Sequence, residues 1–265
     1  MAQIDVRQLV KEFTYIKPRT GLSGMISNLV RPAREHVRAV DSISFAIEAG
    51  EMVGFIGPNG AGKSTTVKML SGILHPTDGT IRINGLSPYH DRARVCRHLG
   101  VVFGQRTQLL WDLRLGESYE LLRRIYEVKS VDFQVIMKRL DQVLAIGELL
   151  SIPVRQLSLG QRMRGDLAAA MLHSPPILFL DEPTIGLDII AKQQVRQFVH
   201  DVNQMSGTTV ILTTHDLDDV EKLCDRLIVI NRGQIIADDD LGRLITQYHL
   251  EKTEIEELVL KLYQQ

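Results

Sequence analysis

The sequence predicts an α/β protein built on a largely parallel β-sheet. Short apolar runs of the kind found in buried strands recur along the chain, and stretches with apolar residues at helical spacing separate them. A glycine-rich loop also joins one of these runs directly to a helical pattern. Alternation of this kind is typical of a sheet that is covered by helices. The apolar runs lie at 52–56, 101–103, 177–180, 210–212 and 227–230.

The first elements follow from residue periodicity. Ile43, Phe45 and Ile47 alternate with smaller or polar residues, which predicts a strand ahead of the buried run at 52–56. The pattern becomes helical from 64 to 74. The later apolar runs are predicted to be further strands of the same sheet.

Two helical regions interrupt or follow the sheet. From 113 to 150 apolar residues recur almost only at helical spacing, so we expect a helical subdomain at about 106–156, inserted between strands. Residues 237–265 are predicted to form a C-terminal helical extension. Its apolar stripe is expected to pack on its own domain, with dimerisation as the alternative. The stripe consists of Ile255, Leu258, Val259 and Leu262, after a capping box formed by Thr253 and Glu256.

Composition excludes several classes of protein. The 265 residues are 44% apolar and 24% charged, as in an ordinary globular protein. A formal charge of −1 disfavours a globally basic nucleic-acid-binding protein, so no nucleic-acid partner is expected. Cys96 and Cys224 form no CxxC pair, which argues against a disulfide framework and indicates a reducing compartment. No apolar stretch approaches the roughly 18 residues of a membrane span, so a cytoplasmic, soluble chain is expected.

The strongest chemical motif is a phosphate-binding loop between a strand and a helix. Glycines in such a loop let backbone N–H groups approach phosphate oxygens, and the positive end of the following helix adds to the attraction. Lys63 is expected to reach the β- and γ-phosphates of a nucleotide, and Ser64 to ligate Mg²⁺. The loop runs Gly57, Pro58, Asn59, Gly60, Ala61, Gly62, Lys63, Ser64 and Thr65.

Two carboxylates follow the apolar run at 177–180. Asp181 suits an outer partner of Mg²⁺, and Glu182 suits a group that orients and deprotonates an attacking water. An acidic pair at the end of a strand is common by itself and can simply cap a turn. Together with the phosphate loop it predicts nucleotide hydrolysis.

A third motif, Leu157-Ser158-Leu159-Gly160-Gln161, precedes a helical pattern at 162–172. Ser158 and Gln161 are spaced as a capping box, which predicts that a helix begins here. A capped helix N-terminus is also an anion site, so the two interpretations are compatible.

With these motifs in this order, the sequence resembles the ATP-binding-cassette (ABC) ATPases. The family pattern at the third motif is LSGGQ, and Leu159 stands where the family usually has glycine, whereas Ser158 and Gly160 are kept. The resemblance extends from about residue 4 to residue 236, which is taken as the ATPase domain, 1–236. The matching elements are Phe13, the loop at 57–64, Gln105, the motif at 157–161, Asp181, Glu182, Asp188 and His215.

The resemblance implies a P-loop NTPase fold, in which a RecA-like core carries an antiparallel β-subdomain and the inserted helices. It also implies a head-to-tail dimer, in which the phosphate loop of one copy and the signature Ser158, Leu159, Gly160 and Gln161 of the other enclose ATP with Mg²⁺. Asp188 would lie in the loop that spans the dimer.

The resemblance assigns further roles to single residues. Gln105 would contact Mg²⁺ and the attacking water, and His215 would hold the γ-phosphate side and orient Glu182. Phe13 is the first candidate to stack on adenine, because an aromatic face accepts any base, and Tyr15 is the alternative.

The family also implies partners in a membrane. The chain would use separate integral permease subunits, peripheral on the cytoplasmic face of the cell membrane, with a transported substrate that the sequence does not name. The residues in and around the motifs resemble those of the subgroup that serves ABC-2-type exporters. A soluble ABC ATPase of the iron–sulfur assembly type is the alternative.

Two features lie outside the core motifs. An apolar stripe from Leu22 to Val30, flanked by arginines in the segment 14–38, is expected to pack on the protein's own sheet, with a membrane-proximal helix as the alternative. Trp111 lies where the family receives a helix of its membrane partner, and ordinary packing is the favoured expectation.

Overall fold

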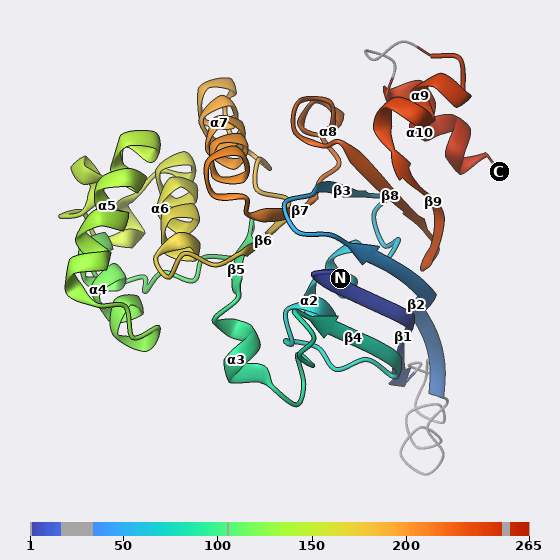
Figure 1. The fold of residues 1–265 in the computed structure, drawn as a ribbon, viewed down its shortest axis with the longest axis horizontal. Helices are drawn as coiled ribbons and strands as arrows, with labels where there is room; N and C mark the ends of the chain where they lie inside the picture. The colour runs from blue at the N-terminus through green and yellow to red at the C-terminus, as the bar shows by residue number, and fades with distance from the viewer. Residues whose placement is uncertain (1, 17–33, 105, 251–254, 265) are drawn as a thin grey trace, which may run out of the picture.

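The computed structural model describes residues 2–16, 34–104, 106–250 and 255–264. Its larger sheet has the strand order β5-β6-β7-β3-β8-β9, in which the first five strands run parallel and β9 is antiparallel to β8 (Figure 1). This confirms the expected mainly parallel sheet. Its strands are β3 (Met52–Ile56), β5 (Leu99–Phe103), β6 (Ile177–Asp181), β7 (Thr209–Thr213), β8 (Arg226–Asn231) and β9 (Gln234–Asp240).

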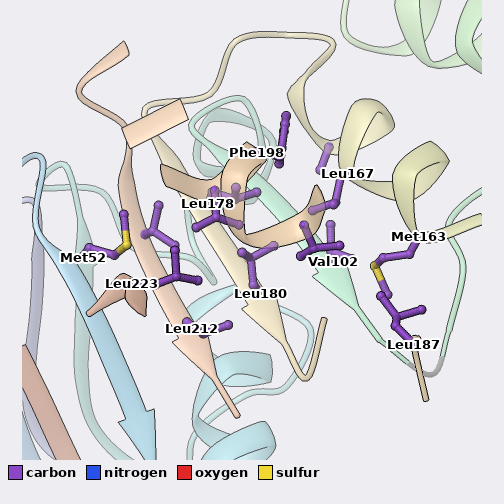
Figure 2. Packing of buried hydrophobic residues seen from close by; sticks show 14 of the residues in the cluster. Met52, Val102, Met163, Leu167, Leu178, Leu180, Leu187, Phe198, Leu212 and Leu223 are labelled. Carbon is purple, nitrogen blue, oxygen red and sulfur yellow. The ribbon is translucent and has the colours of Figure 1, made fainter. Parts of the chain in front are cut away.

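The three central strands are continuous apolar runs because helices or the second sheet cover both of their faces. Every residue of β3, β6 and β7 is buried. One face of these strands packs on α6 (Leu159–Met171) and α7 (Ile189–Ser206). Figure 2 shows Leu178, Leu180 and Val102 on the sheet close to Leu167 and Phe198 from these helices.

A second sheet has three antiparallel strands in the order β2-β1-β4, and it confirms the expected β-subdomain. The strands are β1 (Ile4–Ile16), β2 (Arg34–Ile47) and β4 (Asp78–Ile83). The alternating Ile43, Phe45 and Ile47 of β2 are buried in a separate apolar cluster with residues of β3 and α2 (Lys63–Leu70).

The segment predicted between residues 14 and 38 is therefore strand at both of its ends, since β1 continues to Ile16 and β2 begins at Arg34. The stripe from Leu22 to Val30 lies outside the described residues.

The helical insertion is confirmed between β5 and β6. It contains α4 (Leu115–Ile125), α5 (Ser130–Leu144) and two short 3₁₀ turns, Gly147–Leu149 and Val154–Gln156. In Figure 1 these helices lie with α6 at the left, at the opposite end of the molecule from the three-stranded sheet. The short α3 (Arg92–Cys96) precedes β5.

The C-terminal helices α9 (Leu241–Gln247) and α10 (Ile255–Tyr263) pack beside α8 (Leu217–Leu223). The predicted stripe of α10 is buried in the same apolar cluster as α8 and α9. Packing on the protein's own domain, rather than an exposed dimerisation face, is thus confirmed for this stripe. Thr253 of the predicted capping box lies in the undescribed 251–254.

Candidate active site

The phosphate loop connects β3 to α2, as the sequence predicts. Steric crowding explains why two of its positions are glycine. A Cβ on Gly57 would lie 2.3 Å from the carbonyl oxygen of Ile230, and a Cβ on Gly62 would lie 2.5 Å from that of Ala39. Gly62 also has a φ of +113°, which L side chains rarely adopt. The neighbouring strands therefore fix the loop in a conformation that only glycine permits at these positions.

Lys63 begins α2 and is 6% exposed. Its Nζ donates to the carbonyl oxygens of Gly57 at 2.6 Å and Pro58 at 3.3 Å. Burial lowers the pKa of Lys63, and the carboxylates of Glu182 and Asp181 oppose that shift. The ammonium is held at the loop itself, where phosphate oxygens would compete with the two carbonyl groups for it.

Asp181 ends β6 at the same edge of the sheet. Its Oδ1 accepts hydrogen bonds from Ser64 Oγ at 3.0 Å and from Thr213 Oγ1 at 2.6 Å. The hydroxyl of Ser64 and the carboxylate of Asp181 are hard oxygen donors side by side, which is the donor type that Mg²⁺ prefers. The pair fits the metal role predicted for both residues. Thr213 was not expected from the sequence.

Glu182 and His215 form a hydrogen-bonded pair. His215 Nδ1 lies 2.6 Å from Glu182 Oε2, and the backbone N–H of His215 points at the same oxygen from 3.4 Å. Glu182 has a φ of +56°, a left-handed conformation that is uncommon for residues other than glycine. Its N–H donates to the carbonyl oxygen of Thr213 at 2.9 Å, so pairing across the sheet edge maintains the unusual backbone.

Gly104, at the end of β5, is a site residue that the sequence analysis missed. Its N–H donates to Asp181 O at 2.7 Å, and a Cβ here would lie 2.0 Å from Glu182 O. A glycine directly after a buried strand and next to a predicted catalytic glutamine was the available signal. Gln105 itself lies outside the described residues.

A cavity of about 420 Å³ brings the phosphate loop, the base candidate and the histidine together. It is lined by residues 58–65, Glu182, Ile185 and His215. An adjoining cavity of about 280 Å³ reaches Ser64, Asp181, Lys68 and Arg106. The lining of the first cavity contains neither the predicted signature residues nor Phe13 nor Asp188.

The signature segment lies at the N-terminus of α6. The capping box is confirmed, because Gln161 N–H donates to Ser158 Oγ at 3.2 Å and Ser158 N–H donates to Gln161 Oε1 at 2.9 Å. A Cβ on Gly160 would lie 3.1 Å from Ala191 Cβ, so Gly160 fits closely against α7. Ser158 and Leu159 remain exposed on the surface.

Leu159, which replaces the usual glycine of the family pattern, lies close to the loop that precedes α7. A Cβ placed on Gly186 would lie 3.1 Å from a δ-methyl group of Leu159, so the leucine packs over the backbone of the loop at 186–188. Asp188 ends that loop and caps α7, accepting from Ala191 N–H at 2.8 Å. Next to it, Ile189 and Ile190 are 85% and 72% exposed, an unusual placement for two adjacent isoleucines.

Phe13 and Tyr15 lie two residues apart on β1, and both are about two-fifths exposed. Phe13 pairs with Val37 on β2, and Lys11 Nζ lies 5.2 Å from the centroid of its ring. The geometry leaves both aromatic residues as candidates for adenine stacking.

A profile of the ABC transporter family matches residues 40–185, more than half of the chain. The chain is 32% identical to the ABC transporter ATP-binding protein NatA of Bacillus subtilis over 82% of its own length and 87% of NatA. The chain belongs to the ABC transporter family. The expected family and ATPase fold are thereby confirmed, and the protein is an ATP-binding, ATP-hydrolysing subunit.

Further relatives of this ABC protein are longer than the matched region. It is 36% identical to the probable multidrug ABC transporter ATP-binding protein YbhF of Escherichia coli, over 77% of this chain and 35% of YbhF. It is also 36% identical to the Nod factor export ATP-binding protein I of Neorhizobium galegae, over 75% of this chain and 57% of that protein.

Solved structures agree on the fold. An ATP-binding subunit of an ABC transporter superposes with a TM-score of 0.81 at 25% identity, covering 98% of this chain and 99% of the other. Within the ranges that the structure describes, no helix of this ABC subunit is both long enough and apolar enough to span a bilayer.

Proposed function

We propose that the chain is the ATPase subunit of an ABC-2-type exporter that acts as a head-to-tail dimer on separate permease subunits. The observation that carries the hydrolytic part is the Glu182–His215 pair facing the phosphate loop across one cavity. The names of the relatives support export, since YbhF is called a multidrug transporter protein and the Neorhizobium protein a Nod factor export protein.

The roles of the residues follow from what each one presents. Loop N–H groups and the Lys63 ammonium bind the phosphates of ATP. Ser64 and Asp181, with Gln105 as predicted from the sequence, would hold Mg²⁺, which would supply positive charge to stabilise the phosphate oxygens. Glu182 accepts a proton from the attacking water while the oxygen of that water bonds to the γ-phosphorus. At the same time the bond between the γ-phosphorus and the oxygen that bridges to the β-phosphate breaks. His215 orients the carboxylate of Glu182 toward the attacking water through their hydrogen bond.

The dimer is inferred from what one chain lacks. Ser158, Leu159 and Gly160 are accessible at a helix N-terminus, yet they do not line the phosphate cavity of their own chain. A second copy, placed head to tail, would bring this anion site to the open side of the cavity and cover Ile189 and Ile190. Phe13, or Tyr15 as the alternative, would stack on adenine.

The proposed permease contact and membrane location rest on a second surface. Trp111 is 51% exposed and its neighbour Leu110 is 45% exposed, so about half of each side chain is open to a partner. The guanidinium of Arg162 lies 5.5 Å from the tryptophan ring centroid. This surface, formed by Leu110, Trp111 and Arg162, would receive a cytoplasmic segment of the permease on the inner face of the membrane. The domain limits 1–236 and 237–265 stay predictions, and β9 runs across their boundary.

The proposal is tested with Glu182→Gln. The amide keeps the size and one acceptor oxygen of the side chain but cannot take a proton, so ATP binding should persist while turnover falls by about 100-fold or more. ATP affinity is measured with a fluorescent ATP analogue and turnover by phosphate release. Turnover at the wild-type rate would show that Glu182 is not the base.

A further inference from the structure

A buried carboxylate lies behind the catalytic pair. Asp219 on α8 is fully buried and does not line the phosphate cavity. Its Oδ2 accepts from Thr184 Oγ1 at 2.5 Å and from Thr214 Oγ1 at 3.2 Å, and its Oδ1 accepts from Arg196 Nε at 2.6 Å. The three donors come from three different segments of the chain.

Two of these segments carry residues that line the phosphate cavity, Glu182 and His215. Thr184 lies two residues after Glu182, and Thr214 directly precedes His215. Both threonine hydroxyl groups converge on one carboxylate oxygen, so Asp219 joins the two loops from behind. The same two segments carry Glu182 and His215, whose side chains are in contact at 2.6 Å.

The third segment fixes the carboxylate to α7. Arg196 is largely buried, with 14% of its side chain exposed, and its guanidinium neutralises the buried charge of Asp219. The same arginine lies 3.7 Å from Asp216, which also accepts from Lys192 Nζ at 2.5 Å. Lys192 and Arg196 therefore fix α7, which begins directly after Asp188, to Asp216 and Asp219 in the segment that follows His215.

We propose that Asp219 is a positioning residue for ATP hydrolysis, which sets the distance between Glu182 and His215 by clamping Thr184 and Thr214 to Arg196. The inference rests on the proposed roles of Glu182 and His215. A loop misplaced by about 1 Å can slow an enzyme by about 100-fold, and outer-shell partners commonly contribute factors of about 10 to 100.

Four variants separate positioning from general destabilisation. Asp219→Asn removes the charge that binds Arg196. Thr184→Val removes only the hydroxyl and keeps the branched shape, whereas Thr184→Ser restores a hydroxyl on the same loop. Asp218→Asn is the matched control, because its side chain is 65% exposed and its ion pair with Lys222 spans 3.7 Å.

The measurements are kcat and KM for ATP, the melting temperature, and ATP affinity in the Glu182→Gln background. We expect kcat to fall by about tenfold or more in Asp219→Asn and Thr184→Val, with KM and ATP affinity within about threefold of wild type. Thr184→Ser should retain at least about half of the wild-type kcat, and Asp218→Asn should match wild type.

The proposal would be overturned if Thr184→Val turned over like Asp218→Asn, or if its kcat fell only together with ATP affinity. An equal loss of kcat in Thr184→Ser and Thr184→Val would also overturn the proposal, because the hydroxyl group would then not contribute to kcat. If Asp219→Asn fails to fold, the comparison of Thr184→Val with Thr184→Ser still tests the proposal. Full activity of Glu182→Gln would instead contradict the function proposed above, independently of Asp219.

Discussion

Among single residues, Asp166 on the signature helix is an unusual acid because it is only 4% exposed. Its Oδ1 accepts from Thr107 Oγ1 at 2.8 Å and from Gln108 N–H at 3.1 Å. Burial raises the pKa of Asp166 from its ordinary 3.8 to about 6, and these hydrogen bonds, with the charge of Arg162, only partly offset the desolvation. The charged form therefore destabilises the fold while it holds the segment after Gln105 against α6.

Asp166→Asn is expected to stabilise the protein at pH 8. Between pH 4 and 6 the folded state keeps a proton that the unfolded chain releases, so the free energy of unfolding falls as pH rises through that window. Above pH 6 the cost of burying the ionised Asp166 is fully present, and a raised pKa of this size corresponds to a cost of about 3 kcal/mol. The amide oxygen can still accept both hydrogen bonds, so a gain of about 1–3 kcal/mol is expected.

Urea unfolding at pH 8 and pH 4.5 measures this effect, with the exposed Asp132→Asn on α5 as the control. The gain should shrink at the lower pH, where wild-type Asp166 is mostly protonated. A stability change of equal size at both pH values would contradict the assignment of the penalty to ionisation.

The same scale shows the limit of sequence reasoning about the site. Contiguous motifs placed Lys63, Ser64, Glu182 and His215 correctly in one cavity, because the loop, strand-end and histidine signals are local. Gly104 functions through a backbone contact with a strand far away in sequence, and such contacts leave no periodic pattern.

At the level of elements, the buried strands and the helical insertion were predictable because each has its own hydrophobic period. The long β1–β2 pairing was not, since residues 13–15 and 34–38 show no clean alternation of buried and exposed positions. Bulges between Val6 and Glu12 break the register of β1 on β2, which hides the period of two. The left-handed backbone of Glu182 was equally unpredictable, because pairing across the sheet edge imposes it.

The C-terminal helix α10 gives an element-scale prediction. Leu258 is fully buried against α8 and α9, whereas Leu260 on the same helix is 55% exposed. Leu258→Ala should therefore lower the free energy of unfolding by about 2–5 kcal/mol, because it removes buried methyl groups and leaves a cavity. Leu260→Ala should cost less than about 0.5 kcal/mol.

Chemical denaturation measures both variants, and ATP binding by the folded Leu258→Ala protein should stay close to wild type. The phosphate cavity has no lining residue from α9 or α10, which is the reason for that expectation. Equal stability of the two alanine variants would show that α10 does not pack as an integral part of the domain.

At the scale of the whole molecule, the two halves of the proposed catalytic site lie on one chain but do not meet. The phosphate loop and Glu182 share a cavity, while Ser158 caps an exposed helix end outside it. A variant with a defective loop therefore still carries an intact signature, and a variant with a defective signature still carries an intact loop. Such defects can compensate for each other only if sites form between chains.

Mixing Lys63→Ala with Ser158→Arg should restore ATP hydrolysis that neither variant shows alone. Lys63→Ala removes the cation that binds phosphate, and Ser158→Arg removes the cap and obstructs the anion site. In a one-to-one mixture half of the dimers are mixed, and each has one intact site, so about a quarter of wild-type activity is expected if the sites are independent. Phosphate release at protein concentrations above the dimer dissociation constant measures the recovery, and each variant at the same total concentration is the control. Absence of recovery, while the Ser158→Arg chain still binds ATP, would show that this chain does not build its catalytic site with a second copy of itself.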